Sequence, residues 1–409
     1  MSRKFLETES PKWVEQGIIN AEQQQRLLGL YPPDEKAIGL LPLLGSLLVG
    51  LSALSLIAAN WQGLPETVRL GILLSALAGS YAAGEHFLRR GNHSLGIGLT
   101  GLGLILFGAS IILVSQMYQL IGYDVTGLVA WAVAATALTY LYQSRALFIM
   151  TVVISCIVQG YNTGQLGAFS YATAAFTALS LGYYWWRHPD ALLSTVLAIG
   201  LLWQAGLLVS FLHIKITWFF VGAMLIYTLG DWQNDRPAGR AMQGPPIAAA
   251  FLFMLGLAVF GEAGSYTDML RPPLLAYLAA LGAVFGLSLV AKRKRGRLGG
   301  ATDWLLLLPG FYLPGGLPLA IAALVVLYAY TGTLLWRAHQ EQNSDRVTLG
   351  TVLFILTTAV AYFKLTWGFM DKSLFFLLGG VLLLGLSWYL QRRAAQTLAS
   401  SEPTDKPRS

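Results

Sequence analysis

Long runs of apolar residues, each about 20 residues in length, alternate with short polar gaps along almost the whole chain. Runs of this length are typical of helices that cross a lipid bilayer. We predict an all-α, polytopic helical membrane protein with about fourteen transmembrane helices. The predicted spans are 38–59, 67–88, 95–118, 126–142, 145–161, 167–186, 190–212, 216–232, 245–262, 272–291, 300–313, 316–336, 346–364 and 373–391.

The positive charges alternate between the gaps. About 22 of the 27 Lys and Arg residues lie in every second gap or at the chain ends. Cytoplasmic loops of membrane proteins are enriched in Lys and Arg, so we predict that these gaps and both chain termini are cytoplasmic. Segment 300–313 is short and is interrupted by Pro309-Gly310, so a broken or re-entrant helix is the alternative there. If it did not cross, Arg337 and Arg346 would lie on the wrong side, so the charge pattern favours crossing.

Composition excludes several other classes. Only 11% of residues are charged and 55% are hydrophobic, which is unlike a soluble globular protein. The net charge of +7 fits cytoplasmic loops that face anionic lipid. The basic cluster Lys292–Arg297 is interpreted as a surface anchor, and no nucleic-acid role is expected because no aromatic residues interleave with it.

No cofactor or metal is expected either. The five histidines have no ligand spacing, and Cys156 is a single cysteine inside an apolar run. Gly96 to Gly101 spell G-x-G-x-x-G, but no strand precedes them as a dinucleotide site requires. We interpret the glycines of this span as contacts for close helix packing.

The chain ends are polar. In residues 1–37, Ser10-Pro11 begins one helix and Gly17 ends it, while Asn20 and Gln23 form a capping box for a second. We predict a cytoplasmic helical hairpin that docks on the membrane surface or on the cytoplasmic loops, and that is a possible site for a protein partner. A DNA-binding helix-turn-helix is disfavoured because its recognition helix would contain only one Arg, Arg26. Residues 38–393 form the transmembrane domain, and 394–409 a disordered cytoplasmic tail.

Several phrases resemble a known family. They are the W-x-x-x-G-I-I phrase from Trp13 to Ile19, Ala58-Ala59-Asn60-Trp61, Gln116-Met117-Tyr118, Gly122-Tyr123-Asp124, Trp131 and Tyr362-Phe363-Lys364. The chain resembles the bacterial membrane proteins of the domain of unknown function 2157 family, best over 10–145 and again over 355–393. The resemblance implies a multi-pass protein of the bacterial inner (cytoplasmic) membrane, with no established activity. Lys364 departs from the acidic residue that often follows the Tyr-Phe pair in that family.

Polar and aromatic residues gather at the predicted outer ends of several spans. Single residues of this kind are usually interfacial or bond neighbouring helices. We nevertheless predict an outer-face polar pocket in which Lys364 pairs with Asp124 or Glu262. Its residues are Asn60, Trp61, Gln116, Tyr118, Asp124, Glu262 and Lys364.

Three functions remain open. The first is non-enzymatic transport or the handling of lipid or a small amphiphile, with membrane lipids as partners. The second is a membrane scaffold or envelope sensor that binds a protein through residues 1–37. The third is an enzyme acting on a lipid-linked substrate, which would need Asp124, Glu262 or Asp268 as its acid.

Overall fold

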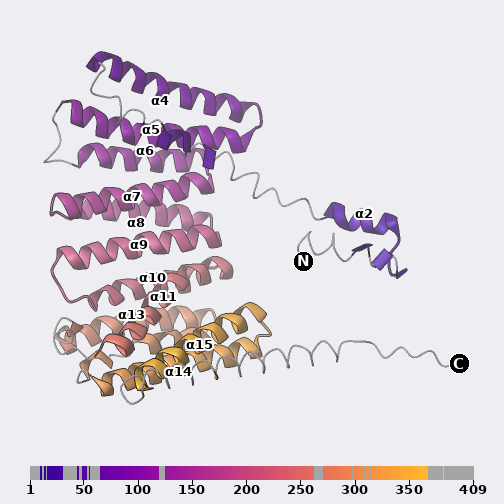
Figure 1. Cartoon of the computed structure of the whole chain (residues 1–409), viewed down its shortest axis with the longest axis vertical. Coiled ribbons are helices and arrows are strands. Elements are labelled where there is room, and N and C mark those ends of the chain that lie inside the picture. The colour runs from indigo at the N-terminus through magenta and orange to yellow at the C-terminus, as the bar shows by residue number, and fades with distance from the viewer. Residues whose placement is uncertain are drawn as a thin grey trace. The chain divides into compact units, whose positions relative to one another are not determined.

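The computed structural model describes residues 10–11, 13–14, 16–30, 44–45, 48–52, 55, 65–118, 125–261, 270–296, 298–307, 310–313, 316–366 and 381. All regular elements within these residues are helices (Figure 1). The chain divides into two compact units, Met1–Phe211 (unit 1) and Leu212–Ser409 (unit 2). The protein is therefore all-helical over its described part, as the apolar pattern predicts.

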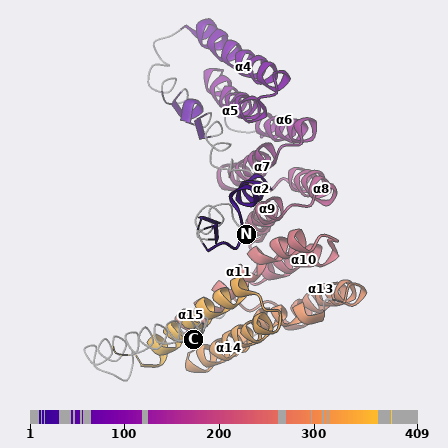
Figure 2. The same ribbon diagram turned by 90° about the vertical axis from the view of Figure 1, so that its right-hand side faces the viewer.

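Unit 1 stacks its long helices side by side in two rows. One row holds α5, α7 and α9, with α4 against α5, and the other holds α6 and α8 (Figure 2). The helices are α2 (Ala21–Leu30), α4 (Glu66–Arg89), α5 (His93–Met117), α6 (Thr126–Tyr142), α7 (Arg145–Gln165), α8 (Tyr171–Arg187) and α9 (Ala191–Phe211).

The glycines of α5 make room for neighbouring side chains. A Cβ at Gly108 would lie 2.3 Å from the ring of Trp131, and one at Gly103 would lie 2.9 Å from the ring of Tyr81. The indole N–H of Trp131 donates to the Leu104 carbonyl at 2.8 Å, which ties α6 to α5. The interpretation of these glycines as close helix contacts is confirmed.

The N-terminal capping box has the expected partners. The Asn20 side chain accepts from the Gln23 backbone N–H at 2.8 Å, and Gln23 Oε1 accepts from the Asn20 N–H at 2.9 Å. Gly17 adopts φ +69°, which glycine permits, just before this cap. Gln24 Nε2 donates to Ser10 Oγ at 2.9 Å, so the two predicted helix starts lie together.

Unit 2 surrounds a short 3-10 segment with α-helices. Segment η2 packs against α11, α13 and α14, while α10 contacts α11 and α13, and α15 contacts α11 and α14. The elements are α10 (Trp218–Trp232), α11 (Arg236–Phe260), α13 (Leu274–Lys294), η2 (Leu298–Leu307), η3 (Gly310–Tyr312), α14 (Leu317–Gln340) and α15 (Ser344–Thr366).

The predicted helix 300–313 differs from expectation. The segment forms the 3-10 helices η2 and η3, and its side chains Leu306 and Phe311 are buried in the core of unit 2. At one end, the Gly300 carbonyl oxygen lies 3.1 Å from the hydroxyl of Tyr227 in α10, and a Cβ at Gly300 would lie 3.3 Å from Lys292 Nζ near the end of α13. The other end meets the start of α13, where Arg271 Nε donates to the Phe311 carbonyl at 3.1 Å. The segment thus runs back along α13 without being a regular membrane-spanning α-helix.

Helix α11 begins nine residues before the predicted span 245–262. Its N-cap is Asp235, whose side chain accepts from the Ala238 N–H at 2.8 Å, and Pro237 occupies the first turn. The apolar run in the sequence begins later, because residues 236–244 include Arg236, Arg240 and Gln243. Pro245 and Pro246 lie inside the helix, which neighbouring helices make tolerable in membrane proteins. The predicted start of α8 at 167 was likewise early, because the helix begins at Tyr171.

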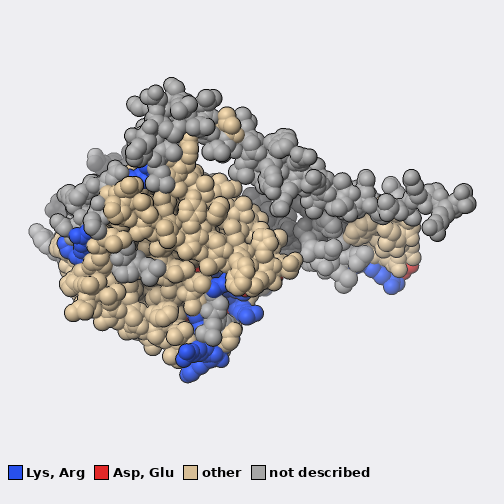
Figure 3. Space-filling view, turned by 90° about the horizontal axis from the view of Figure 1, so that it is seen from below, with Lys and Arg blue, Asp and Glu red and all other residues tan. Residues whose placement is uncertain are grey.

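The helix surfaces suit lipid. Among the described residues, eight helices are long and apolar enough to cross a membrane, and Thr126–Tyr142 is a shorter apolar helix. Large side chains such as Leu179 and Phe260 (both 73% exposed) and Leu275 (84%) face outward, which an aqueous surface would not favour. On the face in Figure 3, Lys and Arg form separate groups among described residues that are mostly uncharged, and Asp and Glu are seen at few places. The count of fourteen spans stays a prediction, since 38–59 and 373–391 lie largely outside the described residues.

Candidate functional site: a polar-to-apolar cavity in unit 2

Unit 2 contains a cavity of about 630 Å³ between α10, α11, α13, η2, α14 and α15. This volume is in the range of small-molecule sites. Eight charged residues line it: Asp231, Arg236, Arg240, Lys292, Asp303, Arg337, Glu341 and Arg346. Seven of them come from the places where α10, α13 and α14 end and where α11 and α15 begin, and Asp303 lies in η2.

The helix directions explain why these charges meet. Consecutive helices run in opposite directions, so the C-terminal ends of α10, α13 and α14 lie on the same side of unit 2 as the N-terminal ends of α11 and α15. The basic residues of the gaps that join these ends therefore lie close together. The opposite end of unit 2 is different. There Arg271 donates to the Phe311 and Leu313 carbonyls, and Lys364 donates to the Val259 carbonyl at 2.9 Å near the end of α11.

A buried ion pair forms the floor of the polar end. Lys292 Nζ lies 2.5 Å from Asp231 Oδ1, and the two side chains are only 2% and 4% exposed. Asp231 also accepts from Gln243 Nε2 at 2.7 Å and from Ser288 Oγ at 2.5 Å. Buried charges are costly unless paired and hydrogen-bonded, and this carboxylate has three donors.

Tyr227 connects that pair to a second carboxylate. Lys292 Nζ donates to the Tyr227 hydroxyl at 2.9 Å, and that hydroxyl donates to Asp303 Oδ2 at 2.7 Å. Lys292 also lies 4.5 Å from the centre of the Tyr227 ring, within cation–π range. Residues of α10, α13 and η2 are thereby joined in one chain of hydrogen bonds.

The mouth of the cavity is held by arginines around one glutamate. Glu341 Oε2 lies 2.9 Å from Arg346 Nη1 and 3.9 Å from Arg240 Nη2. Arg236 and Arg337 line the same cavity. These side chains are partly exposed, as Arg240 and Glu341 at 46% illustrate, so the mouth is open to solvent or headgroups.

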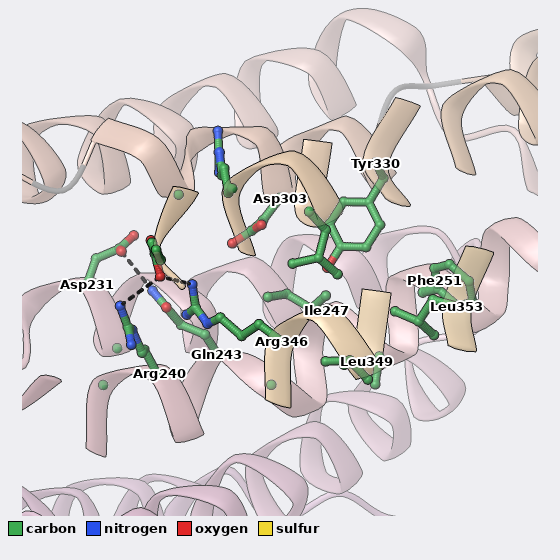
Figure 4. Close-up of a pocket in the computed structure, with 18 of the residues that line it drawn as sticks. Asp231, Arg240, Gln243, Ile247, Phe251, Asp303, Tyr330, Arg346, Leu349 and Leu353 are labelled. Atoms are coloured by element: carbon green, nitrogen blue, oxygen red, sulfur yellow. Dashed lines mark hydrogen bonds and ion pairs between the residues drawn. The ribbon is translucent and has the colours of Figure 1, made fainter. Parts of the chain in front are cut away.

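The other wall of the cavity is hydrocarbon. Figure 4 shows Asp231, Arg240, Gln243 and Arg346 grouped at one end, with Phe251, Leu349 and Leu353 at the other. Further apolar lining residues are Ile247, Ala248, Leu252, Leu334 and Leu356. The lining of the cavity therefore changes along α11 and α15, from positively charged side chains at the mouth to apolar side chains at the other end.

Two facing glycines bring α10 and α11 close enough to build the floor. A Cβ at Gly230 would lie 2.5 Å from the Gly239 carbonyl oxygen, and a Cβ at Gly239 would lie 2.6 Å from that of Gly230. No other residue fits at either place without moving a backbone. The close crossing lets Gln243 of α11 reach Asp231 of α10.

A comparison with known families matches part of unit 1. Residues 11–148 match the DUF2157 family of predicted membrane proteins. This confirms the resemblance over the N-terminal part of the chain, and the protein is a membrane protein of unknown function. No curated protein and no solved structure gives a significant match. The cavity in unit 2 lies outside the DUF2157 region.

The predicted outer-face pocket has seven residues, of which four lie outside the described residues: Asn60, Trp61, Asp124 and Glu262. Gln116 and Tyr118 lie exposed at the end of α5, within the DUF2157 region. Lys364 belongs to unit 2, where it contacts the end of α11 three residues before Glu262 in the sequence. The outer-face pocket therefore stays a prediction.

Sequence reasoning missed Lys292. The pattern of the cluster Lys292–Arg297 predicts a surface anchor, but Lys292 is buried in an ion pair, whereas Arg293 and Lys294 are exposed. A periodic signal was available. Five buried positions of α13 are spaced three or four residues apart and end at the lysine, with buried Ala291 beside it: Tyr277, Leu281, Val284, Ser288 and Lys292. A charged residue that continues such a stripe faces the helix bundle, and it marks a functional candidate.

Unit 1 holds a second polar feature inside the bundle. Gln159 of α7 (0% exposed) and Gln204 of α9 (7%) are buried, and neither side-chain amide has a hydrogen-bond partner among the described residues. The two helices pack closely beside them, since a Cβ at Gly200 would lie 2.5 Å from Val152 Cγ1. Amides inside membrane bundles usually bond a neighbouring helix, and Gln159 makes no such bond to any described residue.

Proposed function

We propose that unit 2 binds an anionic amphiphile, so that the protein handles a membrane lipid or a lipid-like molecule. One observation carries the proposal: a single cavity joins a mouth of four arginines to a wall of aliphatic side chains. Water-soluble anions would not need the wall, and neutral lipids would not need the arginines. A molecule with a charged head and a hydrocarbon chain uses both ends.

The arginines suit a phosphorylated or carboxylated head. Guanidinium groups present planar pairs of donors that match the oxygens of such groups, and they remain charged at any physiological pH. Arg240 comes from α11 and Arg346 from α15, so a head between them would bridge two helices. Glu341 now lies between these two arginines, at the place where a ligand anion would bind.

The aliphatic wall suits the chain of the amphiphile. Phe251 and Leu252 of α11 and Leu349, Leu353 and Leu356 of α15 line it. Burial of each methylene group there contributes about 0.8 kcal/mol. The buried Lys292–Asp231 pair lies behind the mouth and holds α10 and α13 together, so its role in this proposal is to position the polar end.

The test is lipid retention by the full chain. The purified protein is placed in phosphatidylcholine nanodiscs with or without an anionic fraction of phosphatidic acid and phosphatidylglycerol. Retained lipid is then identified by native mass spectrometry. We expect retained anionic lipid, and a loss of about tenfold or more for Arg240→Gln and Arg346→Gln, because each removes a charge-assisted interaction of about 1.5–3 kcal/mol.

Arg293→Gln is the matched control, because Arg293 is exposed beside the site and does not line the cavity. It removes the same charge from the same end of unit 2. Equal retention by all three variants would mean that the lipid binds the surface at large, and the proposal would be wrong. Leu353→Ser tests the wall, and we expect it to weaken retention without changing the preference for anions.

The bacterial inner membrane remains the proposed location. The enzyme alternative depends on Asp124, Glu262 or Asp268, and all three lie outside the described residues. Loss of lipid turnover in a variant of one of these acids, with retention intact, would favour it. The scaffold alternative depends on residues 1–37, where Ile18 (66% exposed) lies on the surface of the hairpin.

A further inference from the structure

The charges around the cavity of unit 2 do not balance. Five cations line it, namely Arg236, Arg240, Lys292, Arg337 and Arg346, against the three carboxylates of Asp231, Asp303 and Glu341. The formal excess is therefore two positive charges. This excess lies on the side of the mouth, because Lys292 and Asp231 neutralise each other on the floor.

We propose that the amphiphile carries a terminal phosphate with two negative charges, that is, a phosphomonoester lipid of the phosphatidic acid type. This inference rests on the proposed function and names the chemical class of its ligand. A phosphomonoester bears a charge of about −1.5 to −2 near neutral pH and presents three acceptor oxygens. A phosphodiester lipid bears one charge, and its second substituent has to fit between the arginines.

Glu341 sets the requirement for the second charge. Its carboxylate already gives Arg346 an ion pair at 2.9 Å and lies 3.9 Å from Arg240. If a singly charged headgroup takes the place of the Glu341 carboxylate, the number of negative charges beside the arginines does not change. Such a headgroup therefore gains little electrostatic energy. A doubly charged head replaces that carboxylate and adds one further charge to a site with an excess of two.

The position of Glu341 makes this exchange feasible. It caps the end of α14, where its N–H donates to the Arg337 carbonyl at 2.8 Å, so its backbone is held in place. Its side chain is 46% exposed, so it can swing away from the mouth without leaving a buried charge behind. Asn343 then caps α15 two residues later, with its side chain accepting from the Arg346 N–H at 3.1 Å. The turn can therefore stay fixed while only the glutamate side chain moves.

The experiment compares dioleoyl phosphatidic acid with dioleoyl phosphatidylglycerol at equal mole fraction in phosphatidylcholine nanodiscs that hold the full chain. Retention is again measured by native mass spectrometry. We expect the wild type to prefer phosphatidic acid by about tenfold, the ratio for a difference of about 1.4 kcal/mol. Arg346→Gln should reduce retention of phosphatidic acid, and Arg293→Gln should leave it unchanged.

Glu341→Gln provides the second arm. It removes the carboxylate that competes with the headgroup, so retention of phosphatidylglycerol should rise. The ratio of retained phosphatidic acid to retained phosphatidylglycerol should therefore fall. Thermal unfolding of each variant shows whether the fold is intact. Inorganic phosphate serves as a competitor, and we expect it not to displace phosphatidic acid at equal concentration, because it makes no use of the apolar wall.

The outcomes separate the two levels of the proposal. Equal retention of the two lipids, with both dependent on Arg240 and Arg346, would overturn the phosphomonoester inference and leave anionic amphiphile binding in place. Retention of neither lipid through these arginines would overturn both. Displacement by inorganic phosphate as effectively as by phosphatidic acid would overturn the lipid as the source of the phosphate. A preference for phosphatidic acid that Glu341→Gln does not narrow would overturn the role of Glu341.

Discussion

Lys292 of α13 and Asp231 of α10 form an ion pair that is almost fully buried, with 2.5 Å between Nζ and Oδ1. Removal of one partner leaves an unpaired charge, and such losses cost about 3–5 kcal/mol. We expect Lys292→Met to lower the thermal stability of the detergent-purified protein severely. Arg293→Met, one residue away and exposed, should have little effect.

A double variant separates charge from packing at this pair. Asp231→Leu combined with Lys292→Met removes both charges, and replacement of a whole buried pair by apolar residues is often neutral. The double variant should recover much of the stability that Lys292→Met loses. Ser288 and Gln243 would still lose their acceptor, so full recovery is not expected. A single variant as stable as the wild type would contradict the structural role of the pair.

The crossing of α10 over α11 should tolerate no side chain at its centre. In Gly239→Ala the new Cβ would lie 2.6 Å from the Gly230 carbonyl oxygen, so a backbone must move, at a cost of about 1–3 kcal/mol. Gly256→Ala, in the same helix α11, is the control because a Cβ there meets nothing within 4 Å. Thermal unfolding should show a loss for the first variant and none for the second. Equal effects would mean that α10 and α11 are not in close contact.

The unpartnered amides of unit 1 lead to the opposite expectation. Gln159→Leu removes a buried polar group that has no hydrogen-bond partner among the described residues, and such groups cost about 1–3 kcal/mol. We expect the variant to be at least as stable as the wild type. Gln243→Leu is the matched contrast, because that amide donates to Asp231 at 2.7 Å and its loss should destabilise. If Gln159→Leu were the more damaging change, the amide must have a bonding role.

Periodicity was sufficient to predict the helices but not the cavity. The run 126–142 coincides with α6, since an uninterrupted apolar stretch bounded by polar residues leaves little freedom at either end. The start of α11 differs from the predicted span because hydropathy marks only the apolar part of a helix, whereas Asp235 and Pro237 begin this helix in a polar stretch. Segment 298–312 could not be recognised as 3-10 helix, because that choice depends on the packing of Leu306 and Phe311 among other helices.

The site was harder to predict because its residues come from a stretch of more than a hundred residues, Gly230 to Leu356. Asp231, Lys292 and Arg346 become neighbours only through the directions of five helices. The charge pattern did place Arg236, Arg240, Arg337 and Arg346 on one predicted side. It was used as a topology signal, and nothing in the local sequence of any one gap indicates that these arginines line a cavity instead of a flat surface.

The side of the membrane that the cavity faces is the last prediction. Gln342 lies in the turn after Glu341 at the mouth, whereas Ile216 precedes α10 at the opposite end of unit 2. The alternation of basic residues predicts that the mouth is cytoplasmic. In a Cys156→Ser background, which removes the single native cysteine, Ile216→Cys should react with a membrane-impermeant thiol reagent added to intact cells.

Gln342→Cys should react only after the membrane is permeabilised. Residue 342 is exposed in the turn between α14 and α15, so the reagent can reach it from the cytoplasmic side. Labelling of Gln342→Cys from outside would reverse unit 2, and the phosphomonoester would then enter from the outer leaflet. Labelling of both positions from outside would place both ends of unit 2 on one side, which the run of α10 through the unit does not allow in a spanning bundle. The cytoplasmic result would leave the arginine mouth facing the inner leaflet, where anionic lipids lie beside positive protein surfaces.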